Sequence, residues 1–258
     1  MAKSGRLTYI GHATVLVEQA GVRLLTDPLL HSGIGHMRRR VPLPELELLR
    51  DLDAVLISHP HADHLDVKSL RMLEHPGTVV APRECAGLLR RAGMRDVVGL
   101  TPGERCDVGA VTIEAVRADH DGRRHPFGRE LGAVGFIVEG PARVYFAGDT
   151  DLFDEMSEVS DSLDVALLPV AGWGRRLPPG HLDPRRAAEA LRLLRPRVAV
   201  PIHWGTYRQF GLSKKPDVLR GPPEAFEQLA HELAPEVDVR LLPVGGSLDL
   251  ASVGVGQR

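Results

Sequence analysis

Cysteine is scarce in this chain, and long apolar runs are missing. Cys85 and Cys106 are the two cysteines among 258 residues, and they do not form a CxxC pair. Two cysteines are too few for a disulfide scaffold, and the pattern fits a reducing compartment. Residues 1–18 lack the basic segment, the apolar run and the small-residue cleavage site of a signal peptide. No window approaches the roughly 18 apolar residues needed to cross a bilayer, so we expect a cytoplasmic protein.

An excess of charge of either sign is also missing. The sequence has 32 Lys plus Arg against 34 Asp plus Glu, which gives a formal net charge of −2. Nucleic-acid binding relies on surplus positive charge to displace counterions from phosphates, so a dedicated nucleic-acid binder is disfavoured. The composition, 43% hydrophobic and 26% charged, is instead typical of a soluble globular protein. We expect a single domain spanning residues 1–258, which at this length buries enough surface to need no disulfides.

Short β-branched runs bounded by Gly and Pro alternate with helical stretches along most of the chain. The pattern begins with a meander of three strands, continues with strands and helices, and then repeats this order, so it predicts two sheets packed face to face with helices outside. Residues 28–50 lose periodicity and are expected to form a long loop. Asp183 before Pro184 is typical of a helix start. The expected strands are 7–10, 14–18, 22–26, 54–57, 78–81, 111–116, 133–138, 143–147, 165–169 and 198–202, with short strands after Val237. The expected helices are 66–74, 82–92, 184–194 and about 223–233.

Three histidines and a carboxylate lie within six positions directly after the expected strand 54–57. These are His59, His61, Asp63 and His64. Neutral imidazole nitrogens are good ligands for zinc and similar divalent cations, so this density indicates a metal site. His59 and His61 can face the same way in an extended loop, while Asp63 and His64 can turn toward a second point.

One segment cannot fill two metal shells, so further ligands are expected at the carboxyl ends of other strands. Three residues qualify by position: His120 after the strand at 111–116, Asp149 after 143–147 and His203 after 198–202. His125 is an alternative to His120, although it precedes Pro126 in a loop.

The segment HPHADH resembles the HxHxDH signature of the metallo-β-lactamase fold superfamily. The segments YIGHATVLV, LTDP, YFAGDT, ALLPV and IHWGT extend the resemblance over roughly residues 6–210. Together they are most similar to the branch that contains N-acyl-phosphatidylethanolamine phospholipase D, with the ascorbate-6-phosphate lactonases more distant. The resemblance implies an α/β fold, the αββα sandwich of two mixed sheets packed face to face with helices outside.

The same resemblance implies two divalent metal ions bridged by Asp149. Zinc suits such a shell, and manganese or iron could fill the same ligands. The implied catalytic residues are Asp63, as a ligand, and His181, which could protonate a leaving group or orient a phosphoryl oxygen. The implied ligands are His59, His61 and His120 on the first metal and Asp63, His64 and His203 on the second, with Asp149 on both.

Further residues near these motifs could support the site or serve the fold alone. His12 has an active-site role or is a buried, hydrogen-bonded histidine. Asp27 could hold a ligand imidazole, and Asp66 could cap the following helix. Trp173 and Trp204 could line the pocket or merely pack. His181 could also be a plain surface-loop histidine.

Five arginines occupy two expected loops near the rim of such a site. Arginine forks bind phosphate well, so Arg38–Arg40 and Arg175–Arg176 could attract an anionic substrate, although solvated loops in an arginine-rich chain are the alternative.

The predicted function is a dinuclear metal-dependent hydrolase that attacks a phosphodiester or similar phosphorylated small molecule with a metal-bound hydroxide. The chain reaches its first expected strand within a few residues and has no evident amphipathic segment for lipid docking, so a lactone or other carboxylic ester is a rival substrate. A non-catalytic metal-binding protein is the alternative of another class, and a homo-oligomer is possible.

Overall fold

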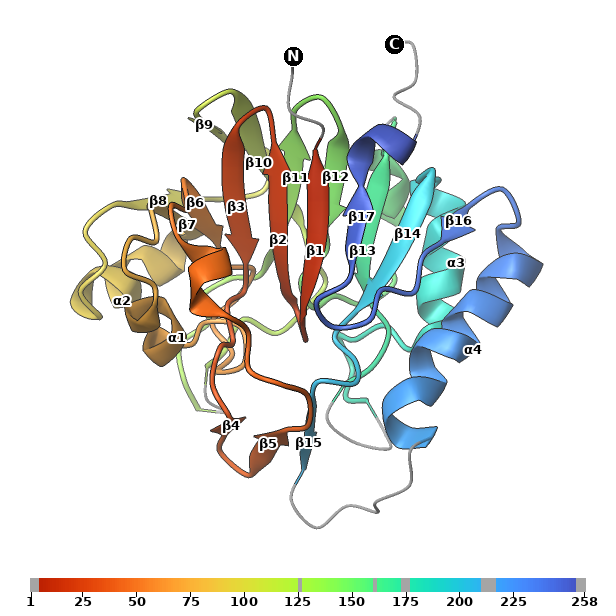
Figure 1. Cartoon of the computed structure of the whole chain (residues 1–258), viewed down its shortest axis with the longest axis horizontal. Helices are drawn as coiled ribbons and strands as arrows, with labels where there is room; N and C mark the ends of the chain where they lie inside the picture. Colours follow the sequence, from red (N-terminus) through yellow and green to blue (C-terminus); the bar gives the residue numbers. More distant parts are fainter. Residues whose placement is uncertain (1–4, 125–126, 160–161, 173–176, 210–216, 254–258) are drawn as a thin grey trace.

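The computed structural model describes residues 5–124, 127–159, 162–172, 177–209 and 217–253. Two seven-stranded sheets pack face to face, and helices cover their outer faces (Figure 1). This is the αββα fold predicted from the sequence. The first sheet has the order β17 (Ser247–Asp249), β1 (Arg6–Gly11), β2 (Thr14–Gln19), β3 (Val22–Thr26), β6 (Ala54–Leu56), β7 (Thr78–Pro82) and β8 (Val97–Leu100).

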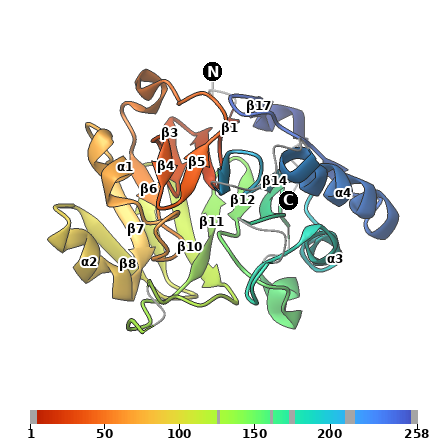
Figure 2. The same cartoon turned by 90° about the horizontal axis from the view of Figure 1, so that it is seen from below.

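The second sheet repeats this plan, with parallel strands on one side and antiparallel strands on the other. Its order is β16 (Asp238–Val239), β14 (Val198–Ile202), β13 (Val165–Pro169), β12 (Arg143–Phe146), β11 (Val134–Glu139), β10 (Val111–Arg117) and β9 (Arg105–Val108). Helices α1 (Val67–Met72) and α2 (Ala86–Arg91) lie outside the first sheet, and α3 (Pro184–Leu194) and α4 (Asp217–Leu233) lie outside the second (Figure 2).

The strands are apolar on both faces because both faces are covered. In β2, Val15 and Val17 point into the core between the sheets, whereas Leu16 belongs to the cluster beneath α1 and α2. Strands buried on both faces have near-continuous apolar runs in place of a strict alternation. The apolar layers, one between the sheets and one beneath the helices on each side, therefore follow from the same apolar runs that predicted the strands.

A small third sheet lies beside the lower edge of the two main sheets in Figure 1. It consists of β15 (Tyr207–Gln209), β5 (Met37–Arg39) and β4 (Gly33–Ile34). The expectation of an irregular loop over residues 28–50 is thus wrong in part, since β4, β5 and a 3-10 helix, Leu46–Leu49, lie within it. These strands are short, and the pairing of β5 with β15, far away in the sequence, defines them.

Other element boundaries also differ from the prediction. The expected helix at 82–92 begins at Ala86, because Pro82 ends β7 and a 3-10 turn intervenes. Helix α4 begins at Asp217, before the Pro222–Pro223 pair that resembles a helix start. Strands β8, β9 and β15 were not predicted. The predicted caps are confirmed: Asp183 accepts a hydrogen bond from Arg186 N, and Asp66 accepts one from Ser69 N.

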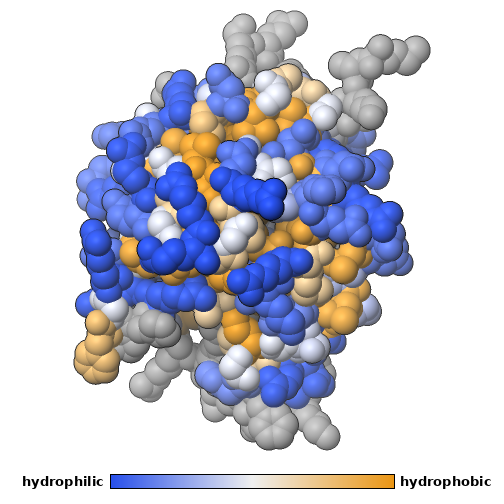
Figure 3. All heavy atoms as spheres, turned by 90° about the vertical axis from the view of Figure 1, so that its left-hand side faces the viewer, coloured by the Kyte–Doolittle hydropathy of each residue, from blue (hydrophilic) through white to orange (hydrophobic). Residues whose placement is uncertain are grey.

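The outer face that carries α1 and α2 is mostly hydrophilic, with apolar side chains scattered between the charged ones (Figure 3). Large exposed apolar residues of the described chain are Leu43, Leu46, Leu48 and Phe127. None of the described helices is long and apolar enough to span a membrane.

Candidate metal centre

The candidate metal-binding side chains follow strands that run in the same direction. Strands β1 and β3 are parallel to one another because each is antiparallel to β2, and β6 is parallel to β3. In the second sheet, β10, β12, β13 and β14 share one direction for the same reason. The loops after β1, β3, β6, β10, β12 and β14 carry His12, Asp27, His59 to His64, His120, Asp149 and His203, respectively.

Three of these residues adopt left-handed backbone conformations. The φ angles are 57° at His12, 30° at Asp27 and 63° at His203. Such angles are uncommon outside glycine and persist where the surroundings enforce them. Here His203 N donates to His12 O over 2.7 Å, and His12 N donates to Thr206 Oγ1 over 2.6 Å. These bonds fix the end of β1 against the end of β14, one from each sheet.

The first donor group consists of His59, His61 and His120. His61 Nδ1 lies 3.0 Å from His59 Nε2 and 3.1 Å from His120 Nε2. His120 Nδ1 donates to Gly180 O over 2.7 Å, so in the neutral ring Nε2 carries a lone pair. That lone pair is directed at the other imidazoles, which is the arrangement of ligands around a shared cation.

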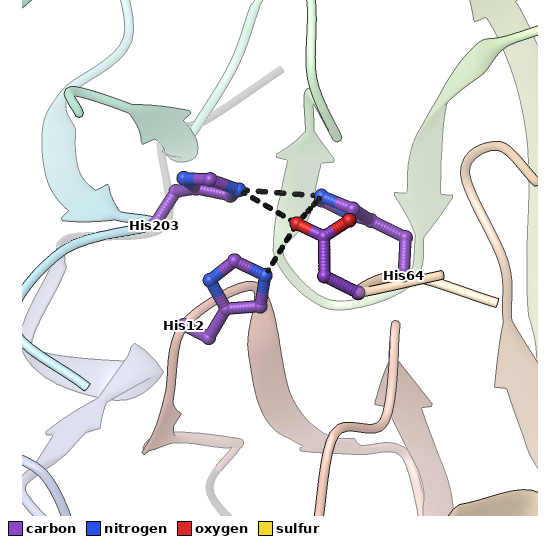
Figure 4. A group of neighbouring side chains, drawn as sticks. His12, His64 and His203 are labelled. Atoms are coloured by element: carbon purple, nitrogen blue, oxygen red, sulfur yellow. Dashed lines mark hydrogen bonds and ion pairs between the residues drawn. The ribbon is translucent and has the colours of Figure 1, made fainter. Parts of the chain in front are cut away.

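The second donor group brings His64 and His203 together (Figure 4). Their Nε2 atoms are 3.3 Å apart, and their rings are stacked with an interplanar angle of 13°. His64 Nδ1 donates to Asp27 Oδ2 over 2.7 Å, and His203 Nδ1 donates to Ala171 O over 2.9 Å. In their neutral forms both rings therefore direct lone pairs at the same point.

Two carboxylates complete the second group. Asp63 Oδ2 lies 3.4 Å from His64 Nε2 and 3.7 Å from His203 Nε2. Asp149 Oδ2 lies 3.2 Å from His64 Nε2, and Asp149 Oδ1 lies 3.5 Å from His203 Nε2. Asp149 Oδ2 is also 4.0 Å from His59 Nε2 of the first group. Asp149 thus lies between the two groups.

The distances between donors suit divalent cations. Ligands about 2.1 Å from a tetrahedral zinc ion are about 3.4 Å from one another, and the pairs in the second group are separated by 3.2 to 3.7 Å. Imidazole and carboxylate together form a typical donor set for zinc, manganese and iron. The residues present therefore fit two cations that share Asp149.

Burial keeps several of the histidines neutral. Burial lowers the pKa of His12 to about 3 and that of His120 to about 4, and it places the pKa of His59 well below the ordinary value. Neutral imidazole is the form that binds metals. These rings are thus available as ligands at neutral pH.

The carboxylates make the second group attractive to positive charge. Burial by itself lowers the pKa of His64, but Asp149, Asp63 and Asp27 raise it well above the ordinary value. Burial likewise raises the pKa of Asp149, yet His203 and His64 lower it well below its usual range. The carboxylates therefore favour positive charge at this point, and a divalent cation would supply it.

Asp27 orients candidate ligands of both donor groups through hydrogen bonds. It is fully buried and accepts hydrogen bonds from His64 Nδ1, from Ser58 N over 2.7 Å and from Ser58 Oγ over 2.5 Å. Ser58 Oγ, whose hydrogen is directed to Asp27, can in turn accept from His59 Nδ1 at 2.9 Å. Asp27 therefore orients one imidazole of each group. Ser58 was missed from the sequence, although its place directly before His59 was a usable signal.

His12 and His181 each contact one carboxylate of the centre. His12 Nε2 lies 3.3 Å from Asp63 Oδ2, and the His12 ring is 4.0 Å from the His203 ring. His181 Nε2 lies 3.5 Å from Asp149 Oδ2, and its Nδ1 lies 3.2 Å from Pro178 O. The structure thus brings both residues to the carboxylates of the second group.

Arg124 holds the histidine-rich loop at both ends. Its Nη1 donates to Pro60 O over 2.6 Å and to Leu65 O over 3.0 Å. No sequence pattern indicated this residue, because its acceptors are backbone carbonyls.

We expect Arg124→Ala to lower the free energy of unfolding by about 3 kcal/mol, the lower limit for its two hydrogen bonds, since each hydrogen bond from a charged donor contributes about 1.5–3 kcal/mol. Urea denaturation of the metal-free protein measures this. Arg123→Ala is the matched control, because Arg123 forms an exposed pair with Asp121, and exposed pairs contribute little. Equal losses in the two variants would contradict the bracing role of Arg124.

In the arginine-rich segment 38–40, Arg39 forms hydrogen bonds within the fold. Arg39 donates to Ile10 O, Leu29 O and Pro42 O, and its guanidinium lies over the Tyr207 ring. This side chain fastens the third sheet to the end of β1, so it is not available for a substrate. His125, Trp173, Arg175 and Arg176 lie outside the described residues. Trp204 packs against Tyr9, with ring centroids 5.9 Å apart.

Comparison with known proteins places this chain in a family. The beta-lactamase superfamily domain matches residues 22–204 of the chain. A UPF0173 metal-dependent hydrolase of Caldivirga maquilingensis is 32% identical over 251 residues, which cover 95% of this chain and 98% of the relative. The chain belongs to the UPF0173 metal-dependent hydrolases.

A phospholipase is among the more distant relatives of this UPF0173 protein. The N-acyl-phosphatidylethanolamine-hydrolyzing phospholipase D 1 of Caenorhabditis elegans is 31% identical over 226 residues, 78% of this chain but 64% of that protein. The predicted resemblance to that branch is therefore a distant relationship.

Solved structures agree with the fold. Igni18, a metallo hydrolase from Ignicoccus hospitalis, superimposes with a TM-score of 0.73 at 25% identity, covering 95% of this chain and 98% of the other. The metallo-beta-lactamase fold protein YhfI of Bacillus subtilis gives a TM-score of 0.68 at 16% identity, with 95% and 99% covered.

Proposed function

We propose that this UPF0173 protein is a hydrolase that works with two divalent cations, zinc being the first candidate, and that its substrates are small phosphodiesters or related phosphorylated molecules. The observation that carries the proposal is the position of Asp149 between two donor groups, 4.0 Å from His59 Nε2 and 3.2 Å from His64 Nε2. A purely structural zinc site is closed by four ligands and needs no carboxylate shared with a second cation. This argues against a non-catalytic metal-binding protein.

Different residues of the chain would bind the two cations and orient their ligands. His59, His61 and His120 would hold one cation, Asp63, His64 and His203 the other, and Asp149 both. Bound there, the cations would supply an acidified water and positive charge for the developing anion. Asp27 and His12 would keep the His64 ring and the Asp63 carboxylate oriented.

His181 is the proposed proton donor. Its ring lies between Asp149 Oδ2 and the carbonyls of Pro178 and Pro179, so both nitrogens face acceptors. Burial alone lowers the pKa of His181, but Asp149 and these carbonyls raise it above its ordinary value. Such a ring can carry a proton to a leaving oxygen.

The substrate class can be tested with two esters that share a leaving group. Protein loaded with zinc or manganese is expected to release p-nitrophenol from bis(p-nitrophenyl) phosphate, whereas chelator-treated protein is not. p-Nitrophenyl acetate is the matched carboxylic ester. Release from the acetate alone, by protein that carries two cations per chain, would reject the phosphodiester and favour the carboxylic-ester or lactone class.

The role of His181 predicts a dependence on the leaving group. With an alkyl leaving group, which must be protonated to depart, His181→Ala should reduce kcat about 10²–10⁴-fold, the usual contribution of general acid catalysis. With the weakly basic p-nitrophenolate the loss should be much smaller. His75→Ala, an exposed histidine away from the centre, is the control. An equal loss with both leaving groups would rule out proton donation by His181.

A further inference from the structure

Three loops that supply the centre are bonded to one another in a closed arrangement. Asp119 N donates to Thr150 Oγ1 over 2.9 Å, and Asp151 N donates to Asp119 O over 2.9 Å. These two bonds join the loop that carries His120 to the loop that carries Asp149. The third loop, with Gly180 and His181, is reached through the side chain of Asp151.

The Asp151 carboxylate connects this third loop to helix α3. Its Oδ2 accepts a hydrogen bond from Gly180 N over 3.2 Å, and its Oδ1 accepts one from Leu152 N over 2.8 Å. Arg186 Nη2, in the first turn of α3, lies 2.7 Å from Oδ1. Asp151 is 9% exposed although it belongs to none of the donor groups. A buried carboxylate with three donors is a fixed point of the structure.

Gly180 transmits the position of Asp151 to the first donor group. Gly180 O accepts the hydrogen of His120 Nδ1 over 2.7 Å, which leaves the lone pair on Nε2. The φ angle of Gly180 is +82°, and a Cβ there would lie 3.2 Å from His120 Nδ1. The glycine therefore permits both the backbone conformation and the close approach of the imidazole.

The same turn positions His181. The His181 ring meets the His120 ring edge-on, with centroids 4.7 Å apart, and its Nε2 reaches Asp149. A shift of Gly180 would thus move a ligand of the first donor group and the proposed proton donor together. Within the described part of the chain, the contact of this turn with the second donor group runs through Asp149.

We propose that Asp151, held by Arg186, is the positioning residue for the first cation: it fixes the Gly180–His181 turn, and this turn fixes the tautomer and direction of His120. The proposal rests on the two-cation function above. It assigns a role to a charged pair outside the ligand set. It also predicts an effect on one of the two cations only.

The test measures the affinities of the two cations separately, by chelator competition with zinc or cobalt. Asp151→Ala and Arg186→Ala should lower the affinity for the first cation about 10–100-fold, the usual effect of removing a residue that orients a ligand. The affinity for the second cation should stay unchanged. Asp151→Asn keeps an acceptor for Gly180 and should fall between these variants and the wild type. Arg185→Ala, which removes the neighbouring arginine and its exposed pair with Glu189, should match the wild type.

A second readout needs no metal. Long-range ¹H–¹⁵N spectra of the metal-free protein should show His120 protonated at Nδ1 in the wild type, and a mixture of tautomers in Asp151→Ala. Unchanged affinities and an unchanged His120 tautomer would overturn the proposal. Equal weakening of both cations, in parallel with a lower melting temperature, would also overturn it, since that result reports a merely structural role. A wild-type protein that binds no cation would instead reject the proposed function, while the His120 spectra still test the positioning.

Discussion

Asp149→Asn is expected to abolish hydrolysis and to remove at least one of the two cations. Asp149 is the one described carboxylate within 4.0 Å of histidines from both donor groups. The substitution keeps the shape of the side chain but removes its charge and replaces one metal-binding oxygen with an amide nitrogen, which has no lone pair for a cation. Because loss of a residue behind a ligand already costs 10–100-fold, loss of a shared ligand should reduce turnover by more than about 100-fold.

The measurements are turnover of bis(p-nitrophenyl) phosphate and metal content after dialysis. Asp154→Asn makes the same chemical change on an exposed residue of the neighbouring 3-10 helix, so it should keep wild-type values of both. If Asp149→Asn retained two cations and full turnover, the assignment of this residue as the shared ligand would be wrong.

Asp27→Ala should produce the largest loss of stability among the substitutions considered. Asp27 is fully buried and accepts three hydrogen bonds, two from Ser58 and one from His64. Without Asp27, the buried His64 ring loses its nearest counter-ion, while Asp63 and Asp149 still favour the charged form of that ring. Breaking a buried pair in this way costs about 3–5 kcal/mol, and the unpaired Ser58 groups add to that loss.

Urea unfolding of the metal-free protein measures this change without a contribution from bound cations. Asp27→Asn, which keeps the volume and one acceptor, should lose less stability. Asp107→Ala, which removes an exposed carboxylate bonded to Thr112, should stay within about 0.5 kcal/mol of the wild type. A loss for Asp27→Ala no greater than that of the control would show that Ser58 and His64 find other partners.

Candidate ligands could be predicted from the sequence where a residue of metal-binding type directly follows an expected strand. His59, His61, Asp63 and His64 are of ligand type and directly follow an apolar run, and His120, Asp149 and His203 each stand at a strand end. The structure places all of these side chains in clusters whose possible ligand atoms lie within 4.8 Å of one another. Their proximity could be predicted because strands that run in one direction end at one edge, and their role as metal ligands stays a prediction.

The supporting residues were not accessible in the same way. Arg124 donates to backbone carbonyls, and Gly180 accepts through its own carbonyl. The residue types involved therefore do not indicate which partner is bound. The third sheet was missed for a related reason. Its strand β5 has three residues and no alternation, and β15, on the far side of the sequence, supplies its partner. Pairing between distant short segments is fixed by the folded chain and not by local propensity.

The joining of the β1 and β14 ends also bears on how the protein folds. His12 N and Thr206 Oγ1 are 194 positions apart in sequence, and His64 and His203 are 139 apart. Contacts across such separations form late, because the chain entropy lost in closing so long a loop is recovered only once both sheets have docked. Cations bound by these donors would stabilise the completed fold and no intermediate that lacks either sheet. Occupancy of the second donor group would therefore report the fraction of molecules that have finished folding.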